Sequence, residues 1–188
     1  AHPVDAQAAQ ADFMVADGHK WMLGPEGLAL FYTRPEVRDR LTLRQHGWHM
    51  TDDPGNFDHH DWRPAASAQR FECGSPNLLC AHALSASLSL LLEAGMETVA
   101  ERIEARIARI EERLRQTERY DFITPTDPAR RAGIFTFRPR DRELEAEYHR
   151  LWDAGVICAR RGGGIRFSPH FYTPEAVIDR ALDILIEG

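Results

Sequence analysis

The segment ADFMVADGHKWMLGPEGLALFY, from Ala11 to Tyr32, decides the fold of this chain. Residues 11–16 (ADFMVA) are mostly apolar and run into the polar residues 17–20 (DGHK), which predicts a short buried strand that ends in a turn. Residues 24–27 (GPEG) predict a further turn, and residues 28–32 (LALFY) predict a second strand. Two strands joined in this way are typical of the edge of a larger sheet.

Lys20 follows the first predicted strand directly, at the kind of strand end where α/β folds place ligands. The chain has 23 Lys and Arg residues, and Lys20 is the single lysine among them. An arginine keeps its proton in proteins, whereas a lysine amine can be tuned to act as a nucleophile or base and to form a Schiff base. Lys20 is therefore a candidate for amine chemistry, and the alternative is a surface cation without a role.

The composition sets limits on the class of protein. The 188 residues are 43% hydrophobic and 28% charged, which is ordinary for a globular protein of one domain or two small ones. A net charge of −6 and the lack of a basic stripe argue against a nucleic-acid partner. Residues 78–92 are too short and too polar to span a bilayer, and residues 1–5 do not resemble a secretory signal. Three cysteines make no disulfide framework, so we expect a cytoplasmic protein with no membrane partner.

Two regions of regular structure are predicted after the second strand. Ser75-Pro76 has the form of an N-cap followed by proline, which predicts a helix from there to about residue 94. Apolar residues at three- and four-residue spacing predict an amphipathic helix over residues 96–117. Beyond it we expect strands near 122–123, 134–137, 156–159 and 165–168, and helices over 141–154 and after Thr173. The chain then has two parts, residues 1–95 and residues 96–188, and the second is a small α+β domain.

Residues 44–69 have no clean period and are rich in Gly, Pro, Asp, His and Trp. A loop of this length inside a compact domain is usually functional or poorly ordered. Its possible metal ligands are His46, His49, Asp58, His59, His60 and Asp61. Because these residues match no ligand motif, we predict a polar active-site loop, with Trp48, and no metal site.

Two further segments carry residues suited to binding anions. In residues 70–77 (RFECGSPN), Gly74 and Ser75 precede a predicted helix, whose exposed N–H groups and positive dipole end attract a phosphate. The alternative is a helix cap without a ligand. In residues 160–170 (RRGGGIRFSPH), Arg166 lies on a strand after a glycine-rich turn and is suited to bind a carboxylate through two hydrogen bonds. Arg160 and Arg161 are better explained as solvated loop cations.

Together these three segments resemble the class V aminotransferases, a group that includes cysteine desulfurases and kynureninases. The resemblance implies that Lys20 forms an internal aldimine with pyridoxal 5′-phosphate and that His19 lies at the cofactor phosphate. It also implies that Gly74 and Ser75 belong to the cofactor-binding residues. Ser75 would reach the phosphate of the other subunit's cofactor, which requires a homodimer. Arg166 would bind the carboxylate of an amino acid substrate. The fold implied is α/β of the PLP-transferase type I, with the rear part of the large-domain sheet and a small C-terminal domain.

The sequence departs from the desulfurase pattern at two places. Desulfurases usually carry Ser where Asp17 stands, and Asp is a poor phosphate donor, so we assign Asp17 no phosphate role. Their nucleophilic Cys lies on the loop before the Arg strand, but residues 161–164 contain no Cys. Cys158 lies on the preceding predicted strand among apolar residues, where a thiol is usually inert. Persulfide chemistry is therefore disfavoured.

The resemblance covers the rear half of a family subunit. The family's Asp at the pyridine nitrogen, and the aromatic residue that stacks on the ring, would lie upstream of residue 1. Without that Asp the ring is a poor electron sink, so we expect the 188 residues alone to be inactive.

Three hypotheses follow from the sequence. The first is a pyridoxal-phosphate enzyme that performs transamination or related chemistry at the Cα of an amino acid. The second is a cysteine desulfurase or lyase with the same fold. The third is a non-catalytic remnant that folds and dimerises but binds no cofactor.

Overall fold

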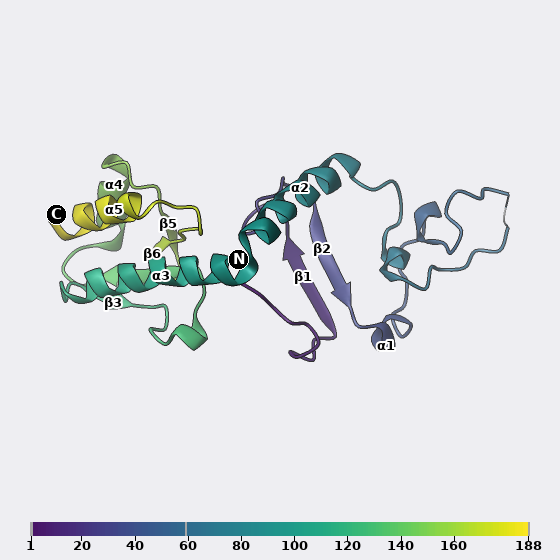
Figure 1. The fold of residues 1–188 in the computed structure, drawn as a ribbon, viewed down its shortest axis with the longest axis horizontal. Helices are drawn as coiled ribbons and strands as arrows, with labels where there is room; N and C mark the ends of the chain where they lie inside the picture. Colours follow the sequence, from purple (N-terminus) through teal and green to yellow (C-terminus); the bar gives the residue numbers. More distant parts are fainter. Residues whose placement is uncertain (1, 59, 188) are drawn as a thin grey trace. The chain divides into compact units, whose positions relative to one another are not determined.

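The computed structural model describes residues 2–58 and 60–187. These residues form two compact units (Figure 1). The first unit comprises residues 4–93, and the second comprises residues 94–187 together with His2 and Pro3. The change of unit falls close to the boundary expected between residues 95 and 96. That the first unit is the remainder of a large cofactor-binding domain, and the second a small C-terminal domain with its connecting helix, stays a prediction.

The first unit begins with the two strands expected from the sequence. β1 (Phe13–Asp17) and β2 (Ala29–Thr33) pair antiparallel, with Phe13 opposite Thr33 and Asp17 opposite Ala29. The remaining elements are α1 (Pro35–Arg38), the 3₁₀ helices η1 (Trp48–Met50) and η2 (Ala68–Phe71), and α2 (Leu78–Ala94). After α1 the N–H groups of Arg40 and Leu41 donate to the carbonyls of Val37 and Arg38, three residues back, in a tighter turn.

The second unit packs helices against a four-stranded antiparallel sheet. Its elements are α3 (Met96–Arg115), β3 (Tyr120–Phe122), η3 (Pro128–Arg130), β4 (Phe135–Pro139), α4 (Leu144–Asp153), β5 (Ala159–Arg161), β6 (Gly164–Phe167) and α5 (Glu175–Glu187). The strand order is β3-β4-β6-β5. α3 contacts α5 and β4, and α4 contacts β4 and β6.

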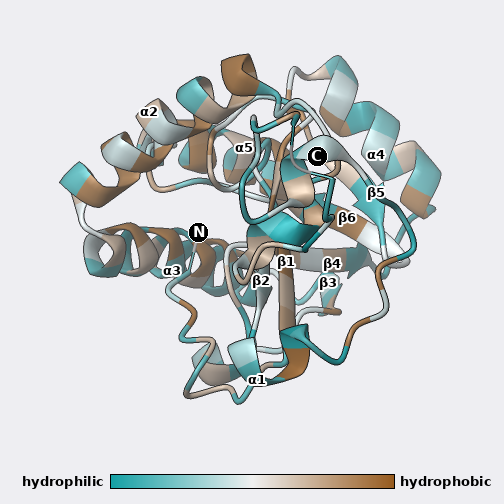
Figure 2. Ribbon diagram, turned by 90° about the vertical axis from the view of Figure 1, so that its right-hand side faces the viewer, coloured by the Kyte–Doolittle hydropathy of each residue, from teal (hydrophilic) through white to brown (hydrophobic). Residues whose placement is uncertain are grey.

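The core of the second unit is built from the apolar positions that the helical spacing predicts. α3 buries Val99, Ile103, Ile107, Ile110 and Leu114 on one face. In Figure 2 hydrophobic stretches of α3 recur between more hydrophilic ones. α5 buries Ile178, Leu182 and Leu185, and β4 buries Phe135 and Phe137. Burying such side chains contributes about 1.5–3 kcal/mol each, so this unit has the core that a separate domain needs.

The last hairpin differs from the expectation for residues 156–159. β5 runs from Ala159 to Arg161, because Gly162 and Gly163 adopt φ values of 62° and 79° and close a tight turn to β6. Arg160 and Arg161 therefore lie on a strand and not on a loop, which corrects the sequence interpretation. The side chain of Arg160 pairs with Glu145 of α4.

Among the described residues, no individual helix has both the length and the apolar character needed to cross a membrane. α2 and α3, taken together as a bent pair, pass this test by length and composition only.

Candidate active site

The turn after β1 is fixed by backbone hydrogen bonds. The N–H of Gly18 donates to the carbonyl of Leu28 at 3.0 Å, and the N–H of Gly24 donates to the carbonyl of Gly18 at 2.8 Å. Within this closed loop the N–H of Leu23 donates to the carbonyl of Lys20 at 3.1 Å. Each bond satisfies a backbone group that the turn removes from the strand ladder. The turn therefore holds the backbone of Lys20 in one place while its side chain stays exposed.

The same turn packs against α2 through positions that admit only glycine. A Cβ at Gly24 would lie 2.7 Å from Leu84 Cδ1 and 3.0 Å from the carbonyl oxygen of Gly18. Leu84 is buried in α2. The thiol of Cys80, one turn earlier in α2, donates to the carbonyl of Glu26 at 3.4 Å. α2 is thus the element that positions the Lys20 turn.

Lys20 forms an ion pair with Asp17, the last residue of β1. The Lys20 Nζ donates a hydrogen bond to Asp17 Oδ2 across three residues of the turn. This hydrogen bond, followed by weaker charge effects of Lys20 and of His19, holds the pKa of the Asp17 carboxyl below its ordinary value. The sequence predicted no partner for Lys20, although carboxylate and amine three residues apart across a turn were a usable signal.

Replacing Lys20 with Met is expected to raise the pKa of Asp17 toward its ordinary 3.8, because the main hydrogen bond that favours the carboxylate is removed. Carbon-detected NMR titration of the carboxyl group measures this shift. Asp121, whose pKa is lowered first by Arg140, is the internal control and should titrate unchanged. An Asp17 titration that does not move would show that the pair is absent in solution.

The start of α2 differs from the sequence prediction. Asn77 is the residue that caps the helix, because its Oδ1 accepts from the N–H of Cys80 at 3.2 Å. Ser75 lies two residues earlier and is exposed, and its hydroxyl forms no hydrogen bond within the described part of the chain. A Cβ on Gly74 would meet nothing within 4 Å. Ser75 is therefore not used as a cap, and the space beside Gly74 is open.

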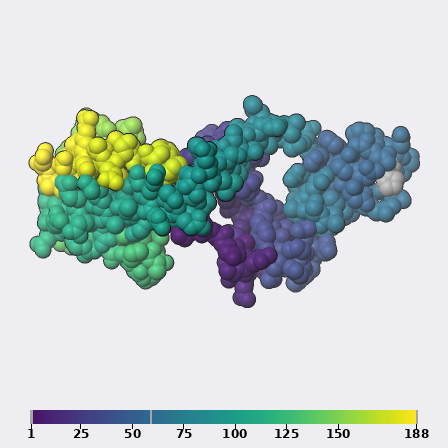
Figure 3. Space-filling model, viewed as in Figure 1, coloured from purple at the N-terminus to yellow at the C-terminus, as the bar shows by residue number. Residues whose placement is uncertain are grey.

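Residues 45–72, here called the 45–72 lobe, are ordered rather than an open loop. The lobe is closed by a bridge between Thr51 and Pro64 and buries Met50 and Ala65. In the space-filling view its residues form a packed body, coloured blue (Figure 3). Of the two alternatives named for such a loop, the packing favours the functional one, and the role as an active-site loop stays a prediction.

The 45–72 lobe is packed against the segment that carries Gly74 and Ser75. A Cβ on Gly47 would lie only 1.7 Å from the carbonyl oxygen of Cys73, so the two backbones are in direct contact. Gln69 Nε2 donates to the carbonyl of His49 at 2.8 Å, and the Cys73 thiol donates to Gln45 Oε1 at 3.7 Å. These contacts fix the backbone just before Ser75.

The histidines of the lobe contact aromatic rings and a carboxylate. The rings of His46 and Trp62 meet edge to face, with their centroids 5.1 Å apart. His49 Nδ1 lies 3.5 Å from Glu72 Oε2. Within residues 2–58 and 60–187 no three His, Cys, Asp or Glu side chains are grouped so as to hold a metal ion. His59, one of the possible ligands named from the sequence, lies outside the described residues.

Arg166 lies on the central strand β6 of the second unit, opposite Thr136 of β4 and Ala159 of β5. Its side chain is half-buried, and its Nε is buried without a hydrogen-bond partner in the described structure. A buried unpaired donor on a cation is unfavourable unless a ligand binds it. Arg166 is therefore available to bind an anion, whereas Arg160 is already paired with Glu145.

The three cysteines are free, and Cys158 is buried. Burial, and then the charge of Glu147, raise the pKa of the Cys158 thiol to about 11. A thiol with this pKa is almost fully protonated at neutral pH. The prediction that Cys158 is inert is consistent with this environment.

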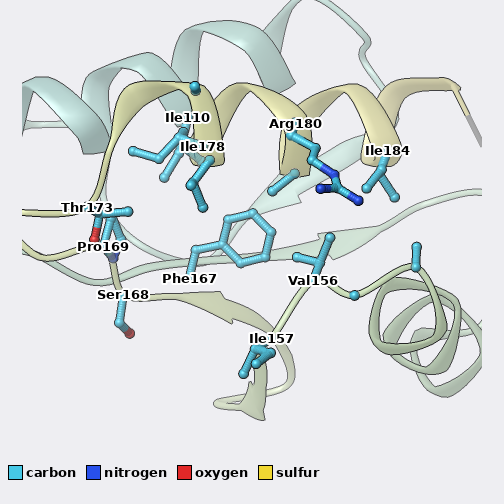
Figure 4. A pocket seen from close by; sticks show the side chains of 15 residues that line it. Ile110, Val156, Ile157, Phe167, Ser168, Pro169, Thr173, Ile178, Arg180 and Ile184 are labelled. Atoms are coloured by element: carbon cyan, nitrogen blue, oxygen red, sulfur yellow. The ribbon is translucent and has the colours of Figure 1, made fainter.

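A pocket of about 640 Å³ lies in the second unit, between α5 and the segment that follows α4 (Figure 4). Its lining is mainly apolar, and Arg180 is the charged residue on its wall. None of the predicted site residues lines it. It is a separate feature of this unit.

The first unit therefore carries His19 and Lys20 on one turn and Gly74 and Ser75 before α2, and α2 contacts the turn directly. Arg166 belongs to the second unit. Sequence reasoning missed two residues: Asp17, which was considered only as a phosphate ligand, and Gly47, whose contact partner lies 26 positions later at Cys73.

Comparison with known sequences supports the resemblance. The family model described as aminotransferase class V matches residues 1–179. The chain is 28% identical to an uncharacterized aminotransferase of Bacillus subtilis over 96% of this chain and 46% of the relative. It is 30% identical to a cysteine desulfurase of Klebsiella pneumoniae over 92% of this chain and 39% of the relative. An isopenicillin N epimerase of Amycolatopsis lactamdurans is 25% identical, over 98% and 48% of the two chains.

Solved structures share the fold. The apo cysteine desulfurase of Thermococcus onnurineus superposes with a TM-score of 0.86 at 22% identity, over 99% of this chain and 49% of that one. The cystine C–S lyase C-DES, in complex with cysteine persulfide, gives a TM-score of 0.83 at 23% identity, over 98% and 49% of the two chains. The chain spans about half the length of the curated relatives it matches. The predicted fold class is confirmed, and the chain belongs to the class V aminotransferase family.

Proposed function

We propose that this chain forms part of a pyridoxal-phosphate enzyme that acts on the α-amino group of an amino acid and binds the cofactor through Lys20. The observation that carries the proposal is the position of Lys20: the single lysine of the sequence stands exposed in a turn that backbone hydrogen bonds hold at the end of β1. Members of the family use this cofactor. Transamination and related reactions at Cα all need such an amine.

The residues present fit the cofactor in chemistry. An aldehyde requires an amine, which Lys20 supplies. A phosphate requires hydrogen-bond donors in open space, and the Ser75 hydroxyl and the surroundings of Gly74 meet this need at the start of α2. His19, exposed beside Lys20, adds a further donor. The carboxylate of an amino acid requires a cation with free donors, and Arg166 has one.

In the proposed reaction the residues have separate roles. The cofactor, when bound, would supply an electron sink for the substrate's Cα. Lys20 would hold the cofactor and would also move the proton at Cα. Arg166 orients the substrate through its carboxylate. His19, Gly74 and Ser75 bind the phosphate, and Ser75 does so for the partner subunit, which makes the working form a homodimer.

We further propose that activity requires the part of the family fold that binds the pyridine ring, which lies outside the 188 residues. The 188 residues alone would then be inactive. An amino-acid-dependent change in cofactor absorbance should appear only when that part is present, and its appearance with the 188 residues alone would contradict the proposal.

The proposed function is tested by trapping the cofactor covalently on Lys20. A polypeptide bearing this sequence is incubated with pyridoxal phosphate, reduced with borohydride and mapped by mass spectrometry. We expect the tag on Lys20 and its loss in Lys20→Arg. Within the 188 residues no other lysine exists, so labelling outside the Lys20 peptide, the α-amine included, provides the background. A tag found only on the α-amine would overturn the proposal and favour a remnant that binds no cofactor.

A cysteine desulfurase is the second candidate, since a desulfurase is among the relatives at 30% identity. The thiol it would need is not supported. Cys158 is buried with a pKa of about 11, and the β5–β6 turn consists of Gly162 and Gly163. Sulfide release from cysteine, measured with the cofactor-loaded protein, separates this candidate from an aminotransferase.

We also propose that the protein is cytoplasmic, with neither membrane nor nucleic acid as a partner. The three free cysteines and the net charge of −6 support this. The homodimer is tested by analytical ultracentrifugation, in which twice the mass of one chain is expected.

A further inference from the structure

Two arginines of the β5–β6 hairpin lie on the same face of the sheet in the second unit. Arg161, the last residue of β5, stands opposite Gly164 of β6, and Arg166 lies two residues further along β6. Residues two apart on a strand share a face, and so do residues paired across two strands. Arg161 and Arg166 are therefore diagonal neighbours, with Cα atoms about 7–8 Å apart.

α4 packs against the opposite face of this sheet. Phe137 and Ile165 are fully buried and paired with each other, and Arg160 is also paired with Ile165, so these three residues share a face. Arg160 forms an ion pair there with Glu145 of α4. Because neighbours on a strand alternate between faces, Arg161 lies on the face away from α4.

Neither Arg161 nor Arg166 has a partner within the described part of the chain. Arg161 is exposed and forms no hydrogen bond or ion pair there, and the buried Nε of Arg166 has no acceptor. Arg138 of β4, on the same face, differs because it pairs with Asp121 at 3.6 Å. Two neighbouring cations without counter-charges repel each other, and a ligand with two negative groups would remove this repulsion.

The position next to both arginines is held by Gly164. A Cβ there would lie 2.5 Å from the carbonyl oxygen of Phe137, so the close approach of β4 requires glycine. The Cδ1 of Ile123 lies 2.8 Å from the same position. The surface beside the two cations is therefore apolar and suits the methylene groups of a short aliphatic chain.

We propose that Arg161 and Arg166 bind the two carboxylates of one substrate, which makes that substrate a dicarboxylic amino acid such as aspartate or glutamate. Arg166 binds the α-carboxylate, and Arg161 binds the carboxylate of the side chain. Arg161 thus selects acidic substrates over neutral ones. The inference rests on the proposed function, in which Arg166 binds the α-carboxylate of an amino acid.

The first test measures the binding of simple diacids to the 188-residue chain without cofactor. Succinate and glutarate are compared with butyrate and valerate, which have the same chain lengths but one carboxylate fewer. Binding is followed at constant ionic strength through the NMR signals of the β5–β6 hairpin. We expect at least one diacid to bind about three- to fivefold more tightly than its monoacid, the effect of one further exposed ion pair.

Three variants assign this preference to a residue. Arg161→Gln should abolish the preference for the diacid and leave binding of the monoacid unchanged, whereas Arg166→Gln should weaken binding of both. Arg160→Gln is the matched control, because it removes the same charge from the adjacent position on the opposite face, and it should keep the preference. Equal binding of diacids and monoacids by the wild type, or equal losses in Arg160→Gln and Arg161→Gln, would overturn the inference.

A second test uses the cofactor-loaded protein that includes the rest of the family fold. Arg161→Gln should lower kcat/KM for aspartate or glutamate about three- to fivefold more than kcat/KM for alanine. A purely structural role of Arg161 would lower both equally, and this result would contradict the inference.

The binding test is independent of the trapping experiment. A diacid preference that depends on Arg161, found without a cofactor tag on Lys20, would sustain the site for two carboxylates and reject the proposed function. A tag on Lys20 with equal binding of diacids and monoacids would reject the inference alone.

Discussion

Replacing Glu147 with Gln is expected to lower the free energy of unfolding of the second unit by about 3 kcal/mol. Glu147 is fully buried in α4. Its carboxylate accepts hydrogen bonds from Arg150 at 2.7 and 2.8 Å, from Arg142 at 2.9 Å and from the hydroxyl of Tyr120 at 3.1 Å. Removing the charge leaves two cations facing one another inside the unit. We take the lower end of the usual 3–5 kcal/mol range because both arginines keep partial contact with solvent.

The network also joins three elements, which explains why one residue has so large an effect. Arg150 NH1 donates to the carbonyl of Ile184, and the Tyr120 hydroxyl lies 3.0 Å from the carbonyl of Leu185. Glu147 thus links α4 and β3 to the end of α5. Urea unfolding is monitored through NMR signals of α4 and β4, so that only the unfolding of the second unit is measured. This is needed because the two units need not unfold together.

Glu145→Gln is the matched control for this experiment. Glu145 lies on the exposed side of the same helix and pairs with His149 at 3.0 Å and with Arg160. Exposed pairs contribute little, so their loss should change the unfolding free energy by less than about 1 kcal/mol. Equal losses in the two variants would contradict the network.

The pH dependence has a definite sign. Burial opposes ionisation of Glu147, but hydrogen bonds and charge from Arg150, and then from Arg142, outweigh it and hold the pKa below the ordinary 4.5. The ionised Glu147 therefore stabilises the folded state fully above pH 4.5, the ordinary pKa. This stabilisation is lost as the pH falls through the lower pKa that Glu147 has in the folded state. The difference in unfolding free energy between the wild type and Glu147→Gln should therefore decrease as the pH is lowered from neutral, which urea unfolding at several pH values measures.

Local patterns predicted most of the strands and helices, because the information lies within a few residues. The roles of the site residues came from the resemblance of three segments to a family, and these roles stay predictions. β1 and β2 were predicted by apolar runs between turns, and Lys20 by its place after a strand. The cap of α2 shows the limit of such reasoning. Ser75-Pro76 and Asn77 both have the form of a helix start, and which one caps depends on backbone geometry that a sequence does not display.

The buried charge of Glu147 was not predicted from the sequence, although Glu147 lies on the same face as Leu144 and Leu151 by helical spacing, which was a usable signal. The packing of the 45–72 lobe rests on contacts between residues far apart in sequence, such as Gly47 and Cys73. Such contacts leave no periodic pattern in the sequence, so this packing was not predicted either.

Gly47→Ala is expected to weaken both the fold of the first unit and its binding of pyridoxal phosphate. The added Cβ would lie 1.7 Å from the carbonyl oxygen of Cys73, and this oxygen cannot rotate away because it belongs to the backbone. Strain of this kind costs about 3 kcal/mol, the upper part of the range for overpacking. The strain is relieved only by moving Cys73 and the neighbouring Gly74 and Ser75.

Two further variants distinguish an effect on the stability of the first unit from an effect on cofactor binding. Asp52→Ala changes an exposed residue of the same lobe and should alter stability by no more than about 0.5 kcal/mol, with binding unchanged. Gly74→Ala adds a Cβ into open space, so it should keep the stability but reduce binding if that space receives the phosphate.

Cofactor affinity is measured as the fraction of Lys20 that borohydride traps with pyridoxal phosphate at increasing concentrations of the cofactor. Stability is measured separately by urea unfolding of the first unit. For Gly47→Ala we expect at least about a tenfold loss of affinity, because displacing a binding group by 1 Å can cost as much as a hundredfold. If Gly47→Ala is destabilised but traps the cofactor as well as the wild type, the packing of the 45–72 lobe does not influence the proposed phosphate site. Unchanged stability would mean that Gly47 and Cys73 are not in contact. The two readouts therefore test the link from a glycine in a loop, through backbone contact, to the segment proposed to bind phosphate.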